Sequence, residues 1–124
     1  MRRIRSLCLA PGVPCLPGCV RAASHYGAED RVFASLQESY PGFDWKKMAD
    51  YHVGRVALHG ERRAHEMEEV AETLRAAGIE PTMAEATARL QAWGGQLNLK
   101  SQFGPEGPAT YREVLDALNS KNQD

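Results

Sequence analysis

Two adjacent arginines, Arg62 and Arg63, are the side chains of this sequence best suited to binding a charged ligand. A guanidinium group can hold a carboxylate or a phosphate through two parallel hydrogen bonds. On a helix, neighbouring side chains point about 100° apart, so at most one of these two enters any given pocket. We group His59 with them as the candidate substrate-binding residues, and we assign no catalytic residue.

The spacing of the histidines does not match that of metal ligands, so we expect them to be ordinary polar residues. His65-Glu66 begins a pattern typical of zinc proteases, but Glu69 stands where the second histidine is required. His59 and His65 are six residues apart, which places them nearly opposite each other on a helix. We therefore expect no metal site. The four histidines of the chain are His25, His52, His59 and His65.

No other pattern supplies a complete catalytic apparatus. Gly94-Gly95 lacks both the preceding strand and the third glycine of a dinucleotide-binding turn. No serine or cysteine lies in a nucleophile motif. A run of glutamates is expected to form a solvated helix face, with Arg62 paired to Glu66 one turn on. We expect the chain alone to bind no cofactor.

The stretch from Leu58 to Pro81 must position these arginines, and it has the pattern of an amphipathic helix. Gly78 suits the left-handed residue that follows a helix, and Pro81 prevents the helix from resuming at once. The other helices are then expected to dock on its apolar side. That side is formed by Ala64, Met67, Val70, Ala71, Leu74 and Ala77.

A helix also precedes this stretch, and a break is expected between the two. Asp44 is a good N-cap for it. An unbroken helix from Asp44 to Ala77 would be about 50 Å long, whereas a compact domain of this size is about 35 Å across. We expect the break at 58–61, near Gly60. Arg62 and Arg63 would then lie in a first helical turn, where the helix dipole disfavours cations. Either the helix is continuous, or these arginines face an anionic group.

The remaining sequence predicts further helices near 19–26, 28–39, 83–93 and 108–118. Thr82 to Glu85 has the pattern of a capping box, with Thr82 as the N-cap. Pro108 suits a first helical position. No segment alternates as a strand does, so the fold class is all-α, with five or six helices. The apolar side expected for the helix over 83–93 is Met83, Ala86, Leu90 and Trp93.

Length, charge and cysteine placement set further bounds. The 124 residues suffice for one domain, which we place at 19–119, with a frayed tail at 120–124. The net charge is -1, so no overall field favours nucleic acid. No apolar run reaches membrane-spanning length, and we expect no membrane partner. All three cysteines lie in the first nineteen residues, so no disulfide framework is expected and a cytoplasmic location is the default.

Residues 1–18 combine arginines, cysteines and several prolines and glycines. They superficially resemble a secretion signal, a lipoprotein cleavage site or a metal-binding stretch. The prolines interrupt the apolar region, and a structural zinc site would need a fourth ligand. We expect an unstructured or wrongly assigned leader.

Three segments together resemble a known family: VRAASHYGAEDRVFASLQESYPGFDW, GRVALHGERRAHEMEEVAETLRAAGIEPTMAEATARLQAW and YREVLDAL. They are similar to the C-terminal helical domain of NAD(P)-dependent oxidoreductases of the 6-phosphogluconate dehydrogenase-like, or β-hydroxyacid dehydrogenase, superfamily. The resemblance covers about Cys19 to Leu118, and its most specific part runs from Arg62 to Met83.

The resemblance implies a domain that closes one wall of a substrate cleft and forms homodimers, beside an N-terminal Rossmann domain that binds NAD or NADP. A small hydroxy acid would bind only when that second domain is present. The family's catalytic lysine has no match, because no lysine precedes Lys46, and a second family lysine falls at His65. The chain is thus expected to be a fragment that is inactive alone. The alternative is a stand-alone helical module that binds a partner protein.

Overall fold

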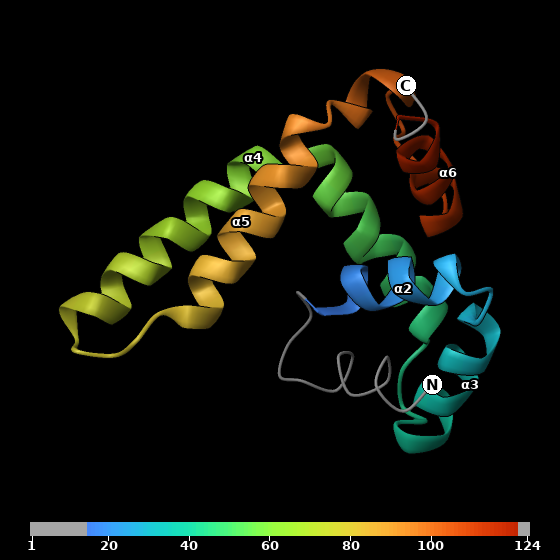
Figure 1. Cartoon of the computed structure of the whole chain (residues 1–124), viewed down its shortest axis with the longest axis horizontal. Coiled ribbons are helices and arrows are strands. Elements are labelled where there is room, and N and C mark those ends of the chain that lie inside the picture. Colours follow the sequence, from blue (N-terminus) through green and yellow to red (C-terminus); the bar gives the residue numbers. More distant parts are fainter. Residues whose placement is uncertain (1–14, 122–124) are drawn as a thin grey trace. The chain divides into compact units, whose positions relative to one another are not determined.

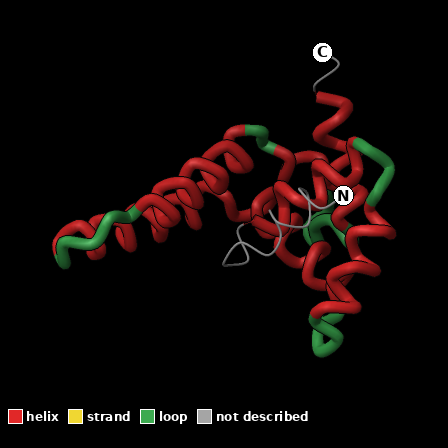
Figure 2. The backbone as a smooth tube through the Cα atoms, turned by 60° about the horizontal axis from the view of Figure 1, so that its bottom comes forward, coloured by secondary structure: helices red, strands yellow, loops and turns green. Residues whose placement is uncertain are grey.

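The computed structural model describes residues 15–121, and every regular element in that range is helical (Figure 1). The predicted all-α class is confirmed, and Figure 2 shows helices joined by short loops without a strand in the described chain. The elements are α2 (Cys15–His25), α3 (Glu29–Ser39), α4 (Trp45–Ala76), α5 (Thr82–Gln96), the 3₁₀ helix η1 (Leu99–Gln102) and α6 (Tyr111–Lys121).

The described chain divides into two compact units. The first unit contains α2, α3, the beginning of α4 and α6, within residues 15–54 and 108–121. The second unit, Arg55–Gly107, contains the rest of α4, α5 and η1. Each unit has buried residues of its own.

Helix α2 begins at Cys15, four residues before the domain boundary placed at residue 19. Pro17 is accommodated because it lies in the first helical turn, where the backbone N–H groups have no partner within the helix. Leu16 and Cys19 are buried. Cys19 is disulfide-bonded, whereas the sequence predicts no disulfide framework. The core of the first unit combines Cys19, Ala23, Val32 and Leu36, with Trp45 packed against it.

Helix α6 is joined to this core through Tyr111. The Tyr111 backbone N–H donates to Asp50 Oδ1 at 2.8 Å, and its hydroxyl donates to Glu29 Oε1 at 3.4 Å. Burial, followed by the charge of Glu29, raises the pKa of the Tyr111 hydroxyl. The helix therefore starts at Tyr111, and the first helical position predicted for Pro108 is wrong. Its end at Lys121 extends the helix into the segment expected to fray.

Helix α4 bends where the sequence predicts a break. His59 has non-helical backbone angles, with φ -131° and ψ 20°. Gly60 follows the bend, and Asp44 caps the helix start by accepting the Lys47 N–H at 3.1 Å. The predicted cap and the predicted break at 58–61 are both confirmed.

The part of α4 after the bend and α5 form a hairpin, in which the two helices lie side by side (Figure 1). Gly78 ends α4 at φ 75°, as predicted, and the Ile79 N–H donates to the Leu74 carbonyl at 2.9 Å. This bond is typical of the Schellman motif. The predicted capping box is wrong. Thr82 is already helical without a side-chain cap, and the Glu85 carboxylate pairs with Arg75 instead.

The buried faces of both helices of the hairpin differ from those predicted. On α4 only Ala64 and Ala71 of the expected apolar side are fully buried, and Val70 is 43% exposed. On α5 the predicted face is wrong, because Met83 is 49% exposed and the other three expected residues are only half-buried. Small residues allow the helices to approach closely, which turns a different side inward. The buried residues of α5 are Ala84, Thr87, Ala88, Gln91 and Gly94.

Candidate functional site

The bend of α4 carries a cluster of positive charges around His59. The pKa of the His59 imidazole lies below its ordinary value of 6.5. The largest cause is burial, followed by the positive charges of Arg55, Arg62, Lys100 and Arg63. These four charges are all cations. The His59 imidazole is therefore held neutral near pH 7 in a positive field, an environment that favours an anionic ligand.

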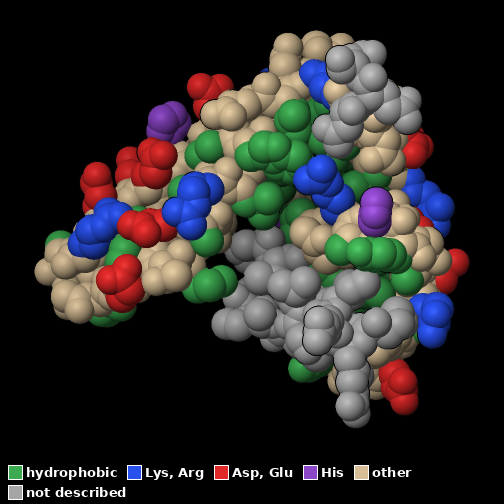
Figure 3. Space-filling model, viewed as in Figure 1, with side chains coloured by type: hydrophobic (Ala, Val, Ile, Leu, Met, Phe, Trp, Pro, Cys, Tyr) green, Lys and Arg blue, Asp and Glu red, His purple; other side chains and the backbone are tan. Residues whose placement is uncertain are grey.

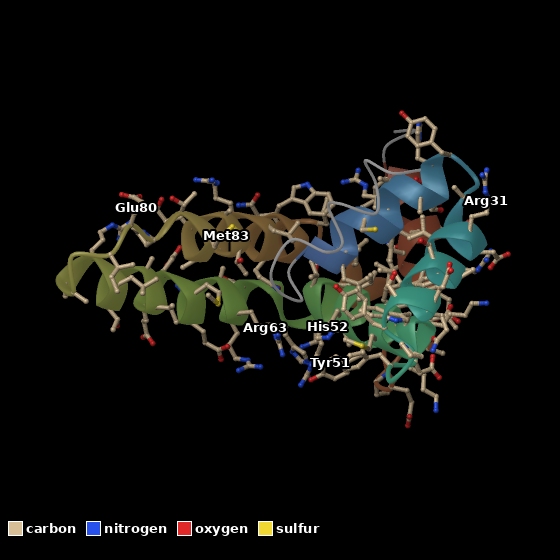
Figure 4. The ribbon with its side chains drawn as sticks, turned by 90° about the horizontal axis from the view of Figure 1, so that it is seen from below. Arg31, Tyr51, His52, Arg63, Glu80 and Met83 are labelled. Carbon is tan, nitrogen blue, oxygen red and sulfur yellow. The ribbon has the colours of Figure 1, made fainter. Side chains whose placement is uncertain are left out.

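The two candidate arginines differ in their surroundings. Arg62 pairs with Glu66 one turn on, as predicted, and both side chains are more than half exposed. Arg63 is half-buried, and its Nε is buried without a hydrogen-bond partner in the part of the chain that the structure describes. Figure 4 shows Arg63 projecting from α4 on the side away from α5 in that view. Of the two, Arg63 has the N–H group that still requires an acceptor.

Two of these cations, Arg55 and Lys100, were missing from the predicted site. Arg55, His59 and Arg63 recur every four residues, a spacing that places side chains on one side of a helix, so a search for that spacing would have found Arg55. Lys100 lies on η1, which follows Asn98 in a left-handed conformation at φ 49°. No sequence pattern links Lys100 to α4.

The other histidines lie outside this cluster. His65 is exposed and its Nδ1 lies 3.3 Å from Glu68 Oε2. His25 and His52 contact the rings of Tyr26 and Tyr51, each with a centroid separation of 4.9 Å. Within residues 15–121, no three histidine, cysteine or acidic side chains are grouped so that they could hold a metal ion.

A groove of about 470 Å³ lies on the hairpin itself, away from the bend. Its alanine floor is flanked by charges of both signs, and the Arg75–Glu85 ion pair links the two helices there. Figure 3 shows acidic and basic side chains gathered along this hairpin. The groove includes none of the predicted substrate-binding residues. It is lined by Glu68, Ala71, Glu72, Arg75, Glu85, Ala88, Arg89 and Ala92.

The cations near the bend are expected to lower the pKa at which His59 titrates. We expect an NMR titration of its ring protons to give a pKa below 6.5, and Arg55→Gln to raise it because one nearby cation is removed. Arg75→Gln, the same change near the far end of α4, is the control and should leave it unchanged. Adding phosphate should raise the pKa as well, if the anion binds beside the imidazole.

The same shift sets the sign of a contribution to stability. The unfolded chain binds the His59 proton more readily than the folded chain does, since the folded pKa is lowered. The lowered pKa of His59 therefore makes the free energy of unfolding higher above pH 6.5 than at acidic pH. This added stability is lost as the pH falls below 6.5. A His59→Gln variant should lose part of its parent's pH dependence in that range, and an unchanged profile would contradict the assignment.

The chain is similar to known proteins in both sequence and structure. Residues 23–94, more than half of the chain, match the family model described as "Domain of unknown function (DUF1932)". The structure is similar to the crystal structure of a conserved hypothetical protein from Sinorhizobium meliloti 1021, with a TM-score of 0.69 and 30% identity. That match covers 86% of this chain and 35% of that protein, so the chain spans about a third of its length. No curated protein matches the chain.

Among the helices of residues 15–121, none combines the length and the apolar composition that crossing a membrane requires.

Proposed function

The chain belongs to the DUF1932 family, and from this premise we propose that it forms the helical substrate-cleft and dimerisation domain of an NAD(P)-dependent hydroxyacid dehydrogenase. The supporting sequence is the segment from Arg62 to Met83, which resembles 6-phosphogluconate dehydrogenase-like enzymes and lies inside the family match. In this proposal the chain contributes one wall of a cleft and is inactive alone. The proposal includes a cytoplasmic location.

The observation that carries the proposal is the buried Nε of Arg63, which has no hydrogen-bond partner among residues 15–121, together with the cations around His59. A hydroxy acid brings a carboxylate that would accept from the Arg63 guanidinium, and a charge-assisted bond of this kind is stronger than a neutral one. Arg62 supplies additional positive field while it remains paired with Glu66. These residues bind and orient an anion, and none of them is assigned a step in hydride transfer.

Gly94 and Gly95 do not form a dinucleotide-binding turn. A dinucleotide site needs glycines in an open turn between a strand and a helix, so that the backbone can approach the phosphates. Gly94 and Gly95 instead lie inside α5, where added Cβ atoms would be 2.3 Å from Val56 Cγ1 and 2.8 Å from the Glu61 backbone nitrogen. Their lack of side chains serves helix packing. In the proposal, the cofactor is bound by a separate Rossmann domain.

The proposed dimer rests on the apolar side chains that the hairpin leaves in solvent. Val70, Ile79 and Met83 are each more than two-fifths exposed, while Met67 and Leu74 are half-buried. Exposed apolar side chains on neighbouring helices favour burial against another surface. A second copy of the chain is the partner that the family resemblance implies.

Complementation tests the function directly. The chain would be co-expressed with the remaining part of the Sinorhizobium meliloti protein, and the complex assayed for nicotinamide reduction with a panel of small hydroxy acids. We expect turnover from the complex and none from either part alone, because hydride transfer needs a cofactor site. Arg63→Gln should raise KM for the acid, while Arg75→Gln, the same charge change near the end of α4, should leave it unchanged. A complex that assembles but never binds NAD or NADP would contradict the proposal.

A further inference from the structure

A second hollow, of about 430 Å³, lies in the first unit where α3 meets the start of α4. Its size is within the range of small-molecule sites. It shares no residue with the cationic cluster at the bend, and the proposed dehydrogenase function does not use it. It is lined by Asp30, Phe33, Ala34 and Gln37 of α3, and by Asp44, Trp45 and Lys46.

The indole of Trp45 is a fixed wall of this hollow. Its Nε1 donates to the Tyr40 carbonyl at 3.2 Å, and it packs against the core of the first unit. The rings of Tyr40 and Phe43 lie at inclined angles to it, with centroid separations of 6.1 Å and 5.5 Å. These contacts hold the Trp45 ring in place, so a ligand that enters the hollow would meet a preorganised aromatic side chain.

The side chains that line the hollow carry one more negative charge than positive charge, while Arg112 interacts with Asp30 from outside the lining. Asp30 and Asp44 contribute two carboxylates and Lys46 one ammonium group. The Lys46 Nζ lies 3.6 Å from Asp30 Oδ1, so the chain itself already places an ammonium group beside that carboxylate. Both side chains are well exposed, and an ion pair of this kind is weak enough for a competing cation to displace.

We propose that this hollow binds a small organic ammonium ion, held between the aromatic surface of Trp45 and the carboxylate of Asp30. A cation gains from the negative face of an indole and from the nearby carboxylate at the same time, whereas a neutral molecule of the same shape gains from neither. Lys46 is the internal competitor for this position. The apolar Phe33 and Ala34 complete the lining against which alkyl groups on the nitrogen would pack.

The experiment compares choline with 3,3-dimethylbutan-1-ol, its neutral isostere, on the full chain. The indole N–H resonance of Trp45, identified with a Trp45→Phe variant, reports binding by NMR. We expect a saturable shift with choline and an affinity for the neutral isostere that is about tenfold weaker. Equal affinities for the two molecules would overturn the proposal, and so would the lack of any saturable shift with choline.

Matched variants separate the site from general charge effects. Lys46→Met should tighten choline binding about threefold, because the competing ion pair is removed. Lys47→Met makes the same charge change one residue away, outside the lining, and should leave the affinity unchanged. Asp30→Asn should weaken binding about tenfold, since it removes the carboxylate and frees Lys46. Glu38→Gln on the same helix is its control. Equal effects of Lys46→Met and Lys47→Met would overturn the proposal.

Discussion

Replacing Gly60 by alanine is expected to destabilise the protein by about 2–3 kcal/mol. A Cβ at this position would lie 2.3 Å from the Gln91 carbonyl oxygen and 2.7 Å from the Gly95 nitrogen. Both are backbone atoms of α5, so neither can rotate away and the two helices would have to separate. Chemical denaturation would measure the loss, which corresponds to about 10 °C in Tm for a chain of this length.

Gly54 is the matched control on the same helix. A Cβ there meets only Pro108 Cγ, at the ordinary contact distance of 3.7 Å. Gly54→Ala should therefore leave stability unchanged or raise it by about 0.5–1 kcal/mol, because alanine restricts the unfolded chain and favours the helix. If Gly60→Ala were as stable as Gly54→Ala, the close approach of α4 and α5 would be wrong.

The close approach of α4 and α5 was not predicted from the sequence, whereas several other features of the fold were. The bend at His59 follows from a length argument and from Gly60, and the end of α4 follows from Gly78. Both depend on residues close together in sequence. The same is true of the helix face of α6, because its buried residues Val114, Leu115 and Leu118 recur at helical spacing in the sequence.

The face of α5 could not be predicted in this way. Its periodicity offers Met83 and Leu90 as apolar positions, but Gly94 and Gly95 allow close contact with α4 through small residues. The side with the smallest side chains is turned inward, and Met83 remains exposed. Hydrophobicity ranks side chains by their preference for burial, whereas a helix crossing is also selected by how closely two backbones can approach.

The candidate site could likewise be predicted only in part from the sequence. His59 and Arg63 were predicted from residue type, and the four-residue spacing would have added Arg55. The difference between Arg62 and Arg63 depends on burial, since Glu66 pairs with one while the Nε of the other is enclosed. Lys100 enters the field of His59 from η1, forty-one positions further along the chain, and only tertiary structure brings the two together.

The second large effect is expected on self-association. We expect the double variant Val70→Glu, Met83→Glu to weaken the proposed dimer at least about 100-fold, which sedimentation or light scattering across a dilution series would measure. Both side chains are apolar and extensively exposed on the α4–α5 hairpin, where Figure 4 marks Met83 on α5 and Glu80 in the preceding turn. In a symmetric dimer each substitution is present twice, so four carboxylates would enter the interface.

The magnitude follows from two additive contributions. Each substitution loses the burial of an apolar side chain, and each new carboxylate must be desolvated in the interface. On α4, the new carboxylate at position 70 would also lie one helical turn from Glu66, a like charge. Tyr26→Glu is the control, because Tyr26 is 73% exposed but lies at the end of α2, outside the hairpin. It should leave association unchanged. A parent chain that stays strictly monomeric at tens of micromolar would contradict the dimer, and equal weakening by Tyr26→Glu would place the interface elsewhere.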